Sequence, residues 1–232
     1  MIGIIGAMRI EVDRILERIE GPVKRVESGI EYISGRLMGV DVVASKCGIG
    51  KVNAAACAQT MALIFKPELI LNTGVAGSLS PELGVGDIAV GTDVVQHDVD
   101  TTALGDPPGM VSTVNLIHFP LDRDAREAIL RAAEALPGIR AVPARIASGD
   151  QFVAASARKK EIVRLFDARA CEMEAGAVAQ ICHLNGIRCA VLRAISDGGD
   201  EGAHLTYAEF LPLAAKNSAE LALEFMARMS GA

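Results

Sequence analysis

The sequence predicts an α/β fold, a three-layer α/β/α sandwich in which helices cover both faces of a central mixed sheet. Short apolar segments alternate along the chain with longer segments whose apolar residues recur at the helical period. Of the 232 residues 50% are apolar and only 3% are aromatic, so aliphatic side chains must build the core. Such a core suits helices packed on a largely parallel sheet. Neither a repeat nor a low-complexity linker interrupts the pattern, and we expect one domain over residues 1–232.

The amino-terminal half begins with a strand, a glycine turn and a helix. Residues 2–5 form a short apolar segment before Gly6, and Ile15, Leu16 and Ile19 then share one face of a helix. The elements expected in this half are, in order, strand 2–5, helix 8–19 closed by Gly21-Pro22, a hairpin of strands 29–37 and 40–45 around Met38-Gly39, helix 53–65, and strands 69–72 and 87–95, with glycine turns at 47–50 and 73–78.

A long irregular segment, residues 97–119, opens the carboxyl-terminal half and contains Pro107-Pro108-Gly109. A loop of this length within a domain is usually functional or covers a neighbouring molecule. The elements expected after it are helix 121–136, strand 140–147, helix 157–166, helix 175–184, strand 188–195 and helix 207–229.

Composition excludes several classes of protein. The formal net charge is −6 and no stripe of Lys or Arg is present, which disfavours a nucleic acid partner because such binding depends on phosphate neutralisation. The start of the chain lacks a basic region before an apolar one, and the apolar residues 52–65 are too few to span a membrane. We therefore expect a cytoplasmic protein.

The five cysteines have no CxxC spacing, so buried free thiols in a reducing compartment are expected rather than a disulfide framework or a zinc site. The segment His97-Asp98-Val99-Asp100 resembles a set of metal ligands, but no further ligand cluster accompanies it. We interpret it as a polar loop after a strand and expect no metal.

Glycine and polar residues follow five of the expected strands, at 6–11, 48–50, 74–78, 149–152 and 196–197. Ligands of α/β proteins bind at the carboxyl ends of strands, so we expect these segments to meet around one site. Gly48-Ile49-Gly50 lacks the spacing of a phosphate-binding loop and is interpreted as a tight turn.

Four acidic residues, two of them in these segments, are candidate catalytic groups. Glu11 alone is explained by the helix N-terminus that it joins, and Asp197 alone by an Asx turn. Glu172 and Glu174 flank Met173 at the start of a helix, where one could cap the helix and the other bind a ligand. Together, at strand ends, these carboxylates favour a catalytic site.

Six segments, in this order and spacing, resemble the methylthioadenosine/S-adenosylhomocysteine nucleosidases of the nucleoside phosphorylase superfamily. The resemblance covers nearly the whole chain and implies a nucleoside phosphorylase-like fold. The segments are Ile4-Ile5-Gly6-Ala7-Met8-Arg9-Ile10-Glu11-Val12, Gly48-Ile49-Gly50-Lys51-Val52, Asn72-Thr73-Gly74-Val75-Ala76-Gly77, Ser148-Gly149-Asp150-Gln151-Phe152, Glu172-Met173-Glu174-Ala175 and Arg193-Ala194-Ile195-Ser196-Asp197.

The resemblance implies a role for each site residue. Glu11 would activate the attacking water, and Asp197, helped by Ser196, would protonate purine N7. The remaining implied contacts are Glu174 and Met173 with the ribose, Phe152 stacked on adenine, the Val153 backbone on the adenine edge, Arg193 on nearby carboxylates, and Met8, Ile49 and Tyr207 around the 5′ substituent. It also implies a small-molecule nucleoside substrate and a homodimer in which residues 97–119 reach the partner's 5′ pocket.

Hydrolysis of an adenine nucleoside requires acidic residues of this kind. Adenine leaves poorly as an anion, so an acid at N7 is needed, and carboxylates stabilise the cation-like sugar. Asp197 can be that acid near neutral pH if a dry site raises its pKa. The chemistry requires neither a metal nor a cofactor.

One departure leaves the substrate open. Val75 stands where many of these nucleosidases have a Ser implied to touch the water, and the surrounding segments resemble the branch that also accepts 6-amino-6-deoxyfutalosine in menaquinone synthesis. Related phosphorylases have Arg and Ser where this chain has Asn72 and Val75, so phosphate capture should be weak. A phosphorylase and a non-catalytic nucleoside-binding protein are the remaining alternatives.

Overall fold

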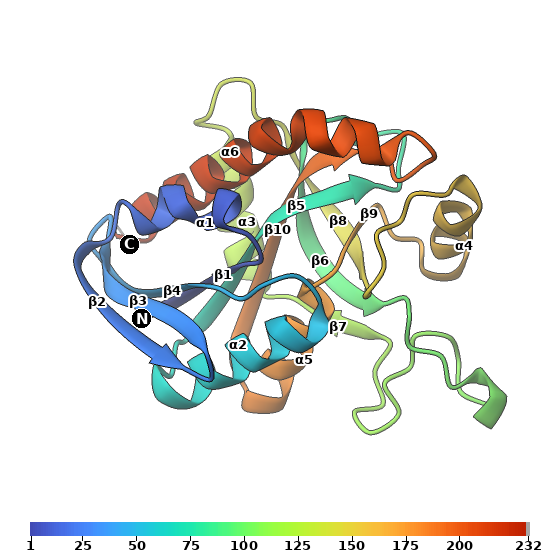
Figure 1. Cartoon of the computed structure of the whole chain (residues 1–232), viewed down its shortest axis with the longest axis horizontal. Helices are drawn as coiled ribbons and strands as arrows, with labels where there is room; N and C mark the ends of the chain where they lie inside the picture. Colours follow the sequence, from blue (N-terminus) through green and yellow to red (C-terminus); the bar gives the residue numbers. More distant parts are fainter. Residues whose placement is uncertain (231–232) are drawn as a thin grey trace.

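Ten strands form the central sheet, and helices cover both of its faces (Figure 1). The structure is a computed structural model that describes residues 1–230. The strands are β1 (Ile2–Gly6), β2 (Glu20–Glu27), β3 (Ile30–Leu37), β4 (Val40–Lys46), β5 (Leu69–Ser78), β6 (Ile88–Gln96), β7 (His118–Pro120), β8 (Ala141–Ser148), β9 (Ala170–Glu172) and β10 (Arg188–Asp197). The helices are α1 (Arg9–Leu16), α2 (Lys51–Ile64), α3 (Arg123–Ala133), α4 (Ser156–Phe166), α5 (Ala175–Asn185) and α6 (Ala203–Met229), with a 3₁₀ turn, η1, at Thr102–Leu104.

The sheet is mixed, as the sequence predicts. β1 lies parallel to β4 and β5, and β5 lies parallel to β10, whereas β2, β3 and β4 form an antiparallel meander. β10 pairs with both β5 and β6, and the pairs β6–β8, β8–β9 and β9–β5 complete a closed ring of strands. This partial closure is a feature that the sequence does not predict.

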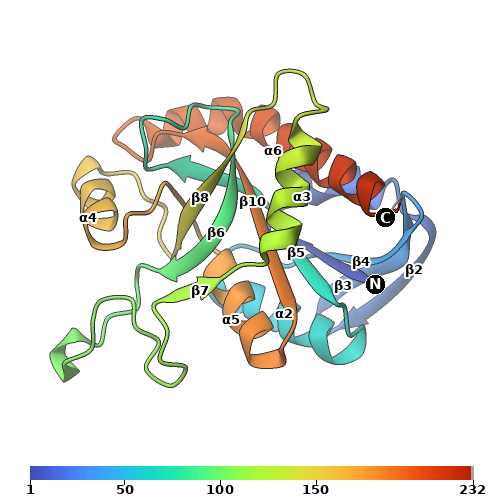
Figure 2. The ribbon, with the colours of Figure 1, turned by 180° about the vertical axis from the view of Figure 1, so that it is seen from behind.

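The helices divide between the two faces of the sheet. α1, α3 and α6 pack on one face through residues such as Ile15, Ile129 and Phe225, and α2 and α5 pack on the other through Met61 and Val178 (Figures 1 and 2). The predicted three-layer arrangement is therefore confirmed. None of the helices within residues 1–230 has the length and apolar character that a membrane span requires.

Strands β2, β7 and β9 are not among the elements expected from the sequence, and β5 is longer than expected. Residues 73–78, expected as a glycine turn, continue β5 to Ser78, because all ten residues of this strand are buried and it pairs with β10 as far as Gly77. Gly21-Pro22, expected to close the first unit, lies inside the edge strand β2. Proline is tolerated on an edge, and β2 departs from regular pairing between Glu20 and Val23.

The hairpin around Met38-Gly39 is confirmed, and both residues have positive φ, 49° and 83°. Helix bounds shift by a few residues: α1 ends at Leu16 rather than at 19, and α6 begins at Ala203 rather than at 207. The segment 97–119 is irregular as expected, apart from η1 and the start of β7, and it projects from the body of the fold (Figure 2).

Candidate active site

A cavity of about 320 Å³ lies where the segments after β1, β4, β8 and β9 meet the ends of β5 and β10. The expectation that these segments surround one site is therefore confirmed. Of the site residues named from the sequence, those lining the cavity are Met8, Glu11, Ile49, Val75, Phe152, Val153, Met173, Glu174, Ser196, Asp197 and Tyr207. Arg193 does not line it and lies buried behind the wall.

Glu11 is held at the start of α1 by backbone groups alone. Its Oε2 accepts hydrogen bonds from the N–H groups of Ala7 (2.9 Å) and Met8 (2.8 Å), and its Oε1 accepts one from Val75 (3.0 Å). The side chain thus closes the helix N-terminus and also faces the cavity. Burial raises the pKa of Glu11, although the Arg193 charge and the backbone N–H groups oppose the shift.

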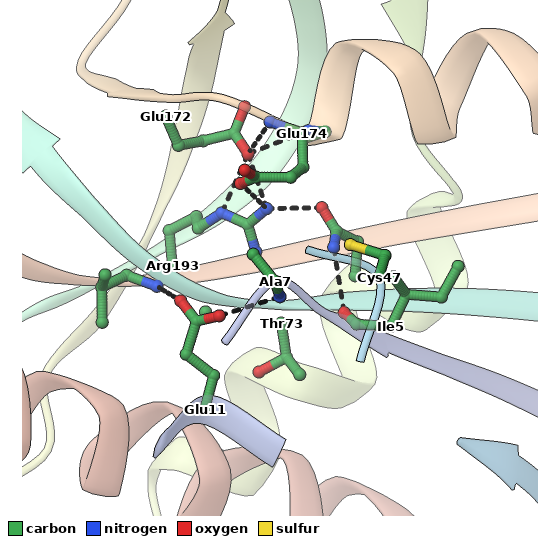
Figure 3. A network of polar contacts seen from close by, with 12 residues as sticks. Ile5, Ala7, Glu11, Cys47, Thr73, Glu172, Glu174 and Arg193 are labelled. Carbon is green, nitrogen blue, oxygen red and sulfur yellow. Dashed lines mark hydrogen bonds and ion pairs between the residues drawn. The ribbon is translucent and has the colours of Figure 1, made fainter. Parts of the chain in front are cut away.

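Arg193 lies between Glu11 and the pair Glu172 and Glu174 (Figure 3). Its guanidinium is 2.6 Å from Glu172 Oε2 and 3.9 Å from Glu174 Oε2, and it donates to the side chain of Asn72. Glu172 Oε2 also accepts from the backbone N–H groups of Glu174 and Ala175, so Glu172 caps α5. Of the two glutamates, the helix-capping partner is therefore Glu172.

Glu174 extends from the start of α5 toward the turn after β4. Its Oε1 accepts a hydrogen bond of 2.8 Å from the N–H of Gly50, a residue whose φ of 96° suits glycine. Burial and the adjacent Glu172 charge raise the pKa of Glu174 to about 7, against the opposing influence of Arg193. This carboxylate is thereby fixed in position but only weakly acidic.

Asp197 ends β10 with both oxygens engaged. Oδ1 accepts from the N–H of Gly199 and Oδ2 accepts from the Ser196 hydroxyl, each at 2.9 Å. The first bond is the Asx turn considered from the sequence. Burial raises the pKa of Asp197 despite these two hydrogen bonds, which favour its charged form. The geometry therefore combines a structural turn with a carboxyl group suited to holding a proton.

An apolar wall closes the opposite side of the cavity. The rings of Phe152 and Tyr207 meet edge to face with centroids 5.5 Å apart, and the Tyr207 hydroxyl lies 3.4 Å from the sulfur of Met8. Phe152 is 48% exposed and Ile49 is 53% exposed, although both line the cavity. The mouth of the cavity is thus apolar and partly open.

Of the lining residues that were not selected as site residues from the sequence, three are small and lie on β5 and β9. A Cβ at Gly77 would lie 2.9 Å from Asp197 Oδ1, and Ala76 and Cys171 complete the same wall. Small side chains give no chemical signal in a sequence, and their role is visible only once β5, β9 and β10 are paired. Among the residues that line the cavity in the described part of the chain, none is Lys, Arg or His.

Comparisons with known proteins agree with this arrangement. A family model described as the phosphorylase superfamily matches residues 1–227. The 5′-methylthioadenosine/S-adenosylhomocysteine nucleosidase of Geobacillus kaustophilus is 41% identical over 228 residues, 97% of this chain and 96% of that protein. The Neisseria meningitidis nucleosidase, solved in complex with methylthio-immucillin-A, has a TM-score of 0.94 at 37% identity over 98% of both chains.

A futalosine hydrolase of Helicobacter pylori is also similar, with a TM-score of 0.92 at 34% identity over 97% of this chain and 96% of that one. The family match and these full-length similarities, together with the shared fold, agree on one assignment. The chain belongs to the phosphorylase superfamily and, within it, to the family of 5′-methylthioadenosine/S-adenosylhomocysteine nucleosidases.

Proposed function

We propose that the protein hydrolyses the N-glycosidic bond of 5′-modified adenine nucleosides, such as methylthioadenosine, S-adenosylhomocysteine and 5′-deoxyadenosine, and releases adenine. One observation carries this proposal: Glu11, Glu174 and Asp197 face the same cavity, and no cationic side chain of residues 1–230 lines it. Such a site favours a sugar that becomes positively charged as its bond to the base breaks. The names of the family members support the same reaction class.

Each carboxyl group has one role in the proposed reaction. Burial raises the pKa of Asp197, which favours its protonated form; in that form it donates to N7 as adenine departs, and the Ser196 hydroxyl orients it. Glu174 accepts hydrogen bonds from the ribose hydroxyls and stabilises the developing positive charge. Glu11 takes a proton from the water that adds to the anomeric carbon. Burial raises the pKa of this carboxyl group, and the nearby Arg193 charge opposes the shift by favouring the ionised form.

The other lining residues position the substrate in this proposal. Phe152 stacks on adenine while backbone groups of Val153 contact the edge of the base, and Met173 packs against the ribose. Met8, Ile49 and Tyr207 surround the 5′ substituent, for which their apolar wall is suited. None of these steps uses a metal or a cofactor.

Water rather than phosphate is the proposed nucleophile. Asn72, at the position where phosphorylases carry Arg, donates to the Ile5 carbonyl at 2.9 Å and accepts from Arg193, so both ends of its amide are occupied. Carboxylates would repel a phosphate dianion in this cavity. Adenine release should therefore proceed at the same rate in phosphate and in phosphate-free buffer.

Accumulation of ribose-1-phosphate products in this assay would instead identify a phosphorylase. Binding of the nucleoside without adenine release would identify a binding protein.

A second substrate class is 6-amino-6-deoxyfutalosine, which has the same adenine–ribose bond. The similarity to a futalosine hydrolase supports it. Comparing kcat/KM for this compound and for methylthioadenosine with one enzyme preparation ranks the two substrates. A ratio above about ten in either direction would correspond to more than about 1.4 kcal/mol of differential transition-state binding.

We also propose a homodimer that works in the cytoplasm. The segment 97–119 projects from the fold and exposes 84% of Leu104, and the cavity mouth exposes Ile49 and Phe152, so a second subunit would cover apolar surface (Figure 2). All five cysteines are free and buried, which suits a reducing compartment. Sedimentation at micromolar concentration should give a dimer, and a fully active monomer would contradict this part of the proposal.

A further inference from the structure

Asp98, Asp150 and Lys51 form a closed ring of hydrogen bonds beside the cavity. Asp98 Oδ2 accepts from the N–H of Asp150 at 2.9 Å, and Asp98 Oδ1 accepts from Lys51 Nζ at 2.7 Å. Asp150 Oδ1 accepts in turn from the backbone N–H of Lys51 at 2.8 Å. The ring joins the segment after β6, the segment after β8 and the first turn of α2, which are far apart in the sequence.

The Lys51–Asp98 side of the ring is largely shielded from water and anchored to the sheet, whereas Asp150 is exposed. The side chains of Lys51 and Asp98 are only 19% and 16% exposed. Lys51 Nζ also donates to Gln96 Oε1 at 3.1 Å, and Gln96 donates to Gln180 of α5 at 2.7 Å. Burial by itself would raise the pKa of Asp98, but the hydrogen bonds from Lys51 and Asp150 together with the Lys51 charge lower it overall, so Asp98 stays ionised.

Two parts of the cavity are attached to this ring. Lys51 directly follows Gly50, whose N–H donates to Glu174 on the ribose side of the proposed site. Asp150 directly precedes Gln151 and Phe152, which line the base side. The ring therefore sets how far the turn 48–50 lies from the loop 150–153, although Asp98, Asp150 and Lys51 are not among the lining residues.

We propose that Asp98 is a positioning residue for nucleoside binding, because it holds the ribose-side turn and the base-side loop at the separation that one nucleoside spans. The inference rests on the proposed function, which assigns base and ribose to these two segments. A ligand that bridges both segments binds more tightly when their separation is already fixed, because less conformational entropy of the protein is lost on binding. Adenine alone contacts the base-side loop and Asp197 but not the ribose-side turn, so it gains little from the ring.

A purely structural role for Asp98 predicts a different result, namely a loss of stability with unchanged binding in the folded fraction. Asp87, just before the other end of β6, provides the matched control. Its Oδ2 accepts from the N–H of Gly84 at 2.9 Å and from Arg140 at 2.7 Å, and its side chain is 21% exposed. Asp87→Ala thus removes an equivalent ion pair and amide contact at a site away from the cavity.

The test compares Asp98→Ala, Asp87→Ala and the unsubstituted protein with two ligands. The ligands are adenine and a 5′-methylthio C-nucleoside of adenine, whose carbon–carbon glycosidic bond cannot be hydrolysed, and calorimetry gives each Kd. For Asp98→Ala we expect the nucleoside to lose about tenfold or more in affinity while adenine changes less than about threefold. Asp87→Ala should change neither affinity, and equal losses for both ligands in Asp98→Ala would overturn the inference.

Lys51→Met keeps the test decisive if Asp98→Ala does not fold. This change removes only the ammonium group and leaves the Lys51 N–H bonded to Asp150. We therefore expect a smaller loss of nucleoside affinity than in Asp98→Ala, again with little change in adenine affinity. If Lys51→Met loses no affinity for either ligand, or loses the same affinity for both, the ring does not set the separation of the two segments. An error in the proposed function would give a different result from an error in this inference, because the unsubstituted protein would then release no adenine from methylthioadenosine.

Discussion

Asp197 uses its two oxygens differently, and this separates its structural role from its chemical one. Oδ1 accepts the Gly199 N–H and maintains the turn after β10, whereas Oδ2 faces the Ser196 hydroxyl. An asparagine at this position can keep the first contact through its carbonyl oxygen but has no carboxyl proton to give. The residue is therefore suited to a substitution that removes acid catalysis and leaves the turn in place.

We expect Asp197→Asn to lower kcat by roughly 10²–10⁴-fold while KM changes little, because N7 gains its proton only as the bond breaks. Glu11→Gln should also be slow, since the water loses its base while leaving-group activation remains. The measurement is kcat and thermal unfolding on the same Asp197→Asn sample. If the protein is well folded and its kcat lies within a few-fold of the original, Asp197 is not the acid and has only its turn-forming role.

Val75 contributes its backbone rather than its side chain to the site. Its N–H donates to Glu11 Oε1 at 3.0 Å, and any residue type can supply that contact. We therefore expect Val75→Ser to keep kcat within a few-fold, with about 1–2 kcal/mol lost in unfolding free energy from the missing methyl groups. Steady-state kinetics and urea unfolding test this. An inactive but folded Val75→Ser protein would show that the valine side chain itself is required.

Glu174 should make stability depend on pH with a definite sign. Its pKa is raised to about 7 in the folded protein from 4.5, so the folded state binds more protons than the unfolded state between these values. The contribution of Glu174 to folding is therefore favourable at low pH and is lost as pH rises through about 7.

Glu174→Gln lacks this titration. Its unfolding free energy relative to the original protein should increase by about 1–3 kcal/mol between pH 5 and pH 8. Thermal unfolding of both proteins across that range provides the comparison. If the difference in unfolding free energy between the two proteins stays constant or falls as pH rises, the pKa of Glu174 is not raised in the folded protein.

At the scale of elements, β5 explains why part of the fold could be predicted and part could not. Its first half, residues 69–72, is a plain apolar strand in the sequence, and the hairpin at Met38-Gly39 is equally direct. Its second half contains Gly74 and Gly77, which are typical of a turn, yet the glycines are there because Glu11, Arg193 and Asp197 press against the strand. Local propensity cannot report a contact with residues so distant in the chain.

The same limit applies to β2 and to the ring-forming strand β9. The β2 residues are almost all exposed, so this strand lacks the alternation of buried and exposed positions that identifies a strand in a sequence. β9 has only three residues and is defined by its partners β5 and β8. For the cavity, the carboxylates and aromatics were predictable from the residue types and the family resemblance, whereas the small side chains between them were not.

Gly74 offers a test of how tightly β5 and α1 approach each other. A Cβ there would lie 2.6 Å from Glu11 Oε1 and 3.1 Å from a nitrogen of Arg193, distances that force the carboxylate to move. We expect Gly74→Ala to lower kcat/KM by roughly 10²-fold or more and to cost about 1–3 kcal/mol of stability. Gly84→Ala, where the nearest atom is 3.8 Å away, is the control for adding a methyl group. Activity near the original level in Gly74→Ala would place Glu11 outside the reaction.

At the scale of the whole molecule, α6 packs against elements that are distant from one another in the sequence. This helix of 27 residues packs against α1 and α3 and against β5 and β10. One face of the sheet is thus covered by elements from the beginning, the middle and the end of the chain (Figure 1). Partial unfolding of any one of them would expose the apolar surface of the others.

We therefore propose that residues 1–232 unfold as one unit. Urea unfolding at a fixed protein concentration should give coincident transitions by far-ultraviolet circular dichroism and by tyrosine fluorescence. The chain has no Trp and two Tyr, and Tyr32 is fully buried while Tyr207 lies at the cavity, so fluorescence reports on both regions. Two separated transitions would contradict the single-domain organisation.

The anchoring of Glu11 by three backbone N–H groups has a consequence for how freely the surrounding sequence can diverge. Main-chain amides are supplied by every residue except proline, so side chains at positions 7, 8 and 75 can change without releasing the carboxylate. Natural variation at the pocket wall is thereby uncoupled from the placement of the proposed base. A lineage can remodel the walls around its nucleoside, exchanging Ser for Val at position 75 among other changes, while the glutamate beside them keeps its place.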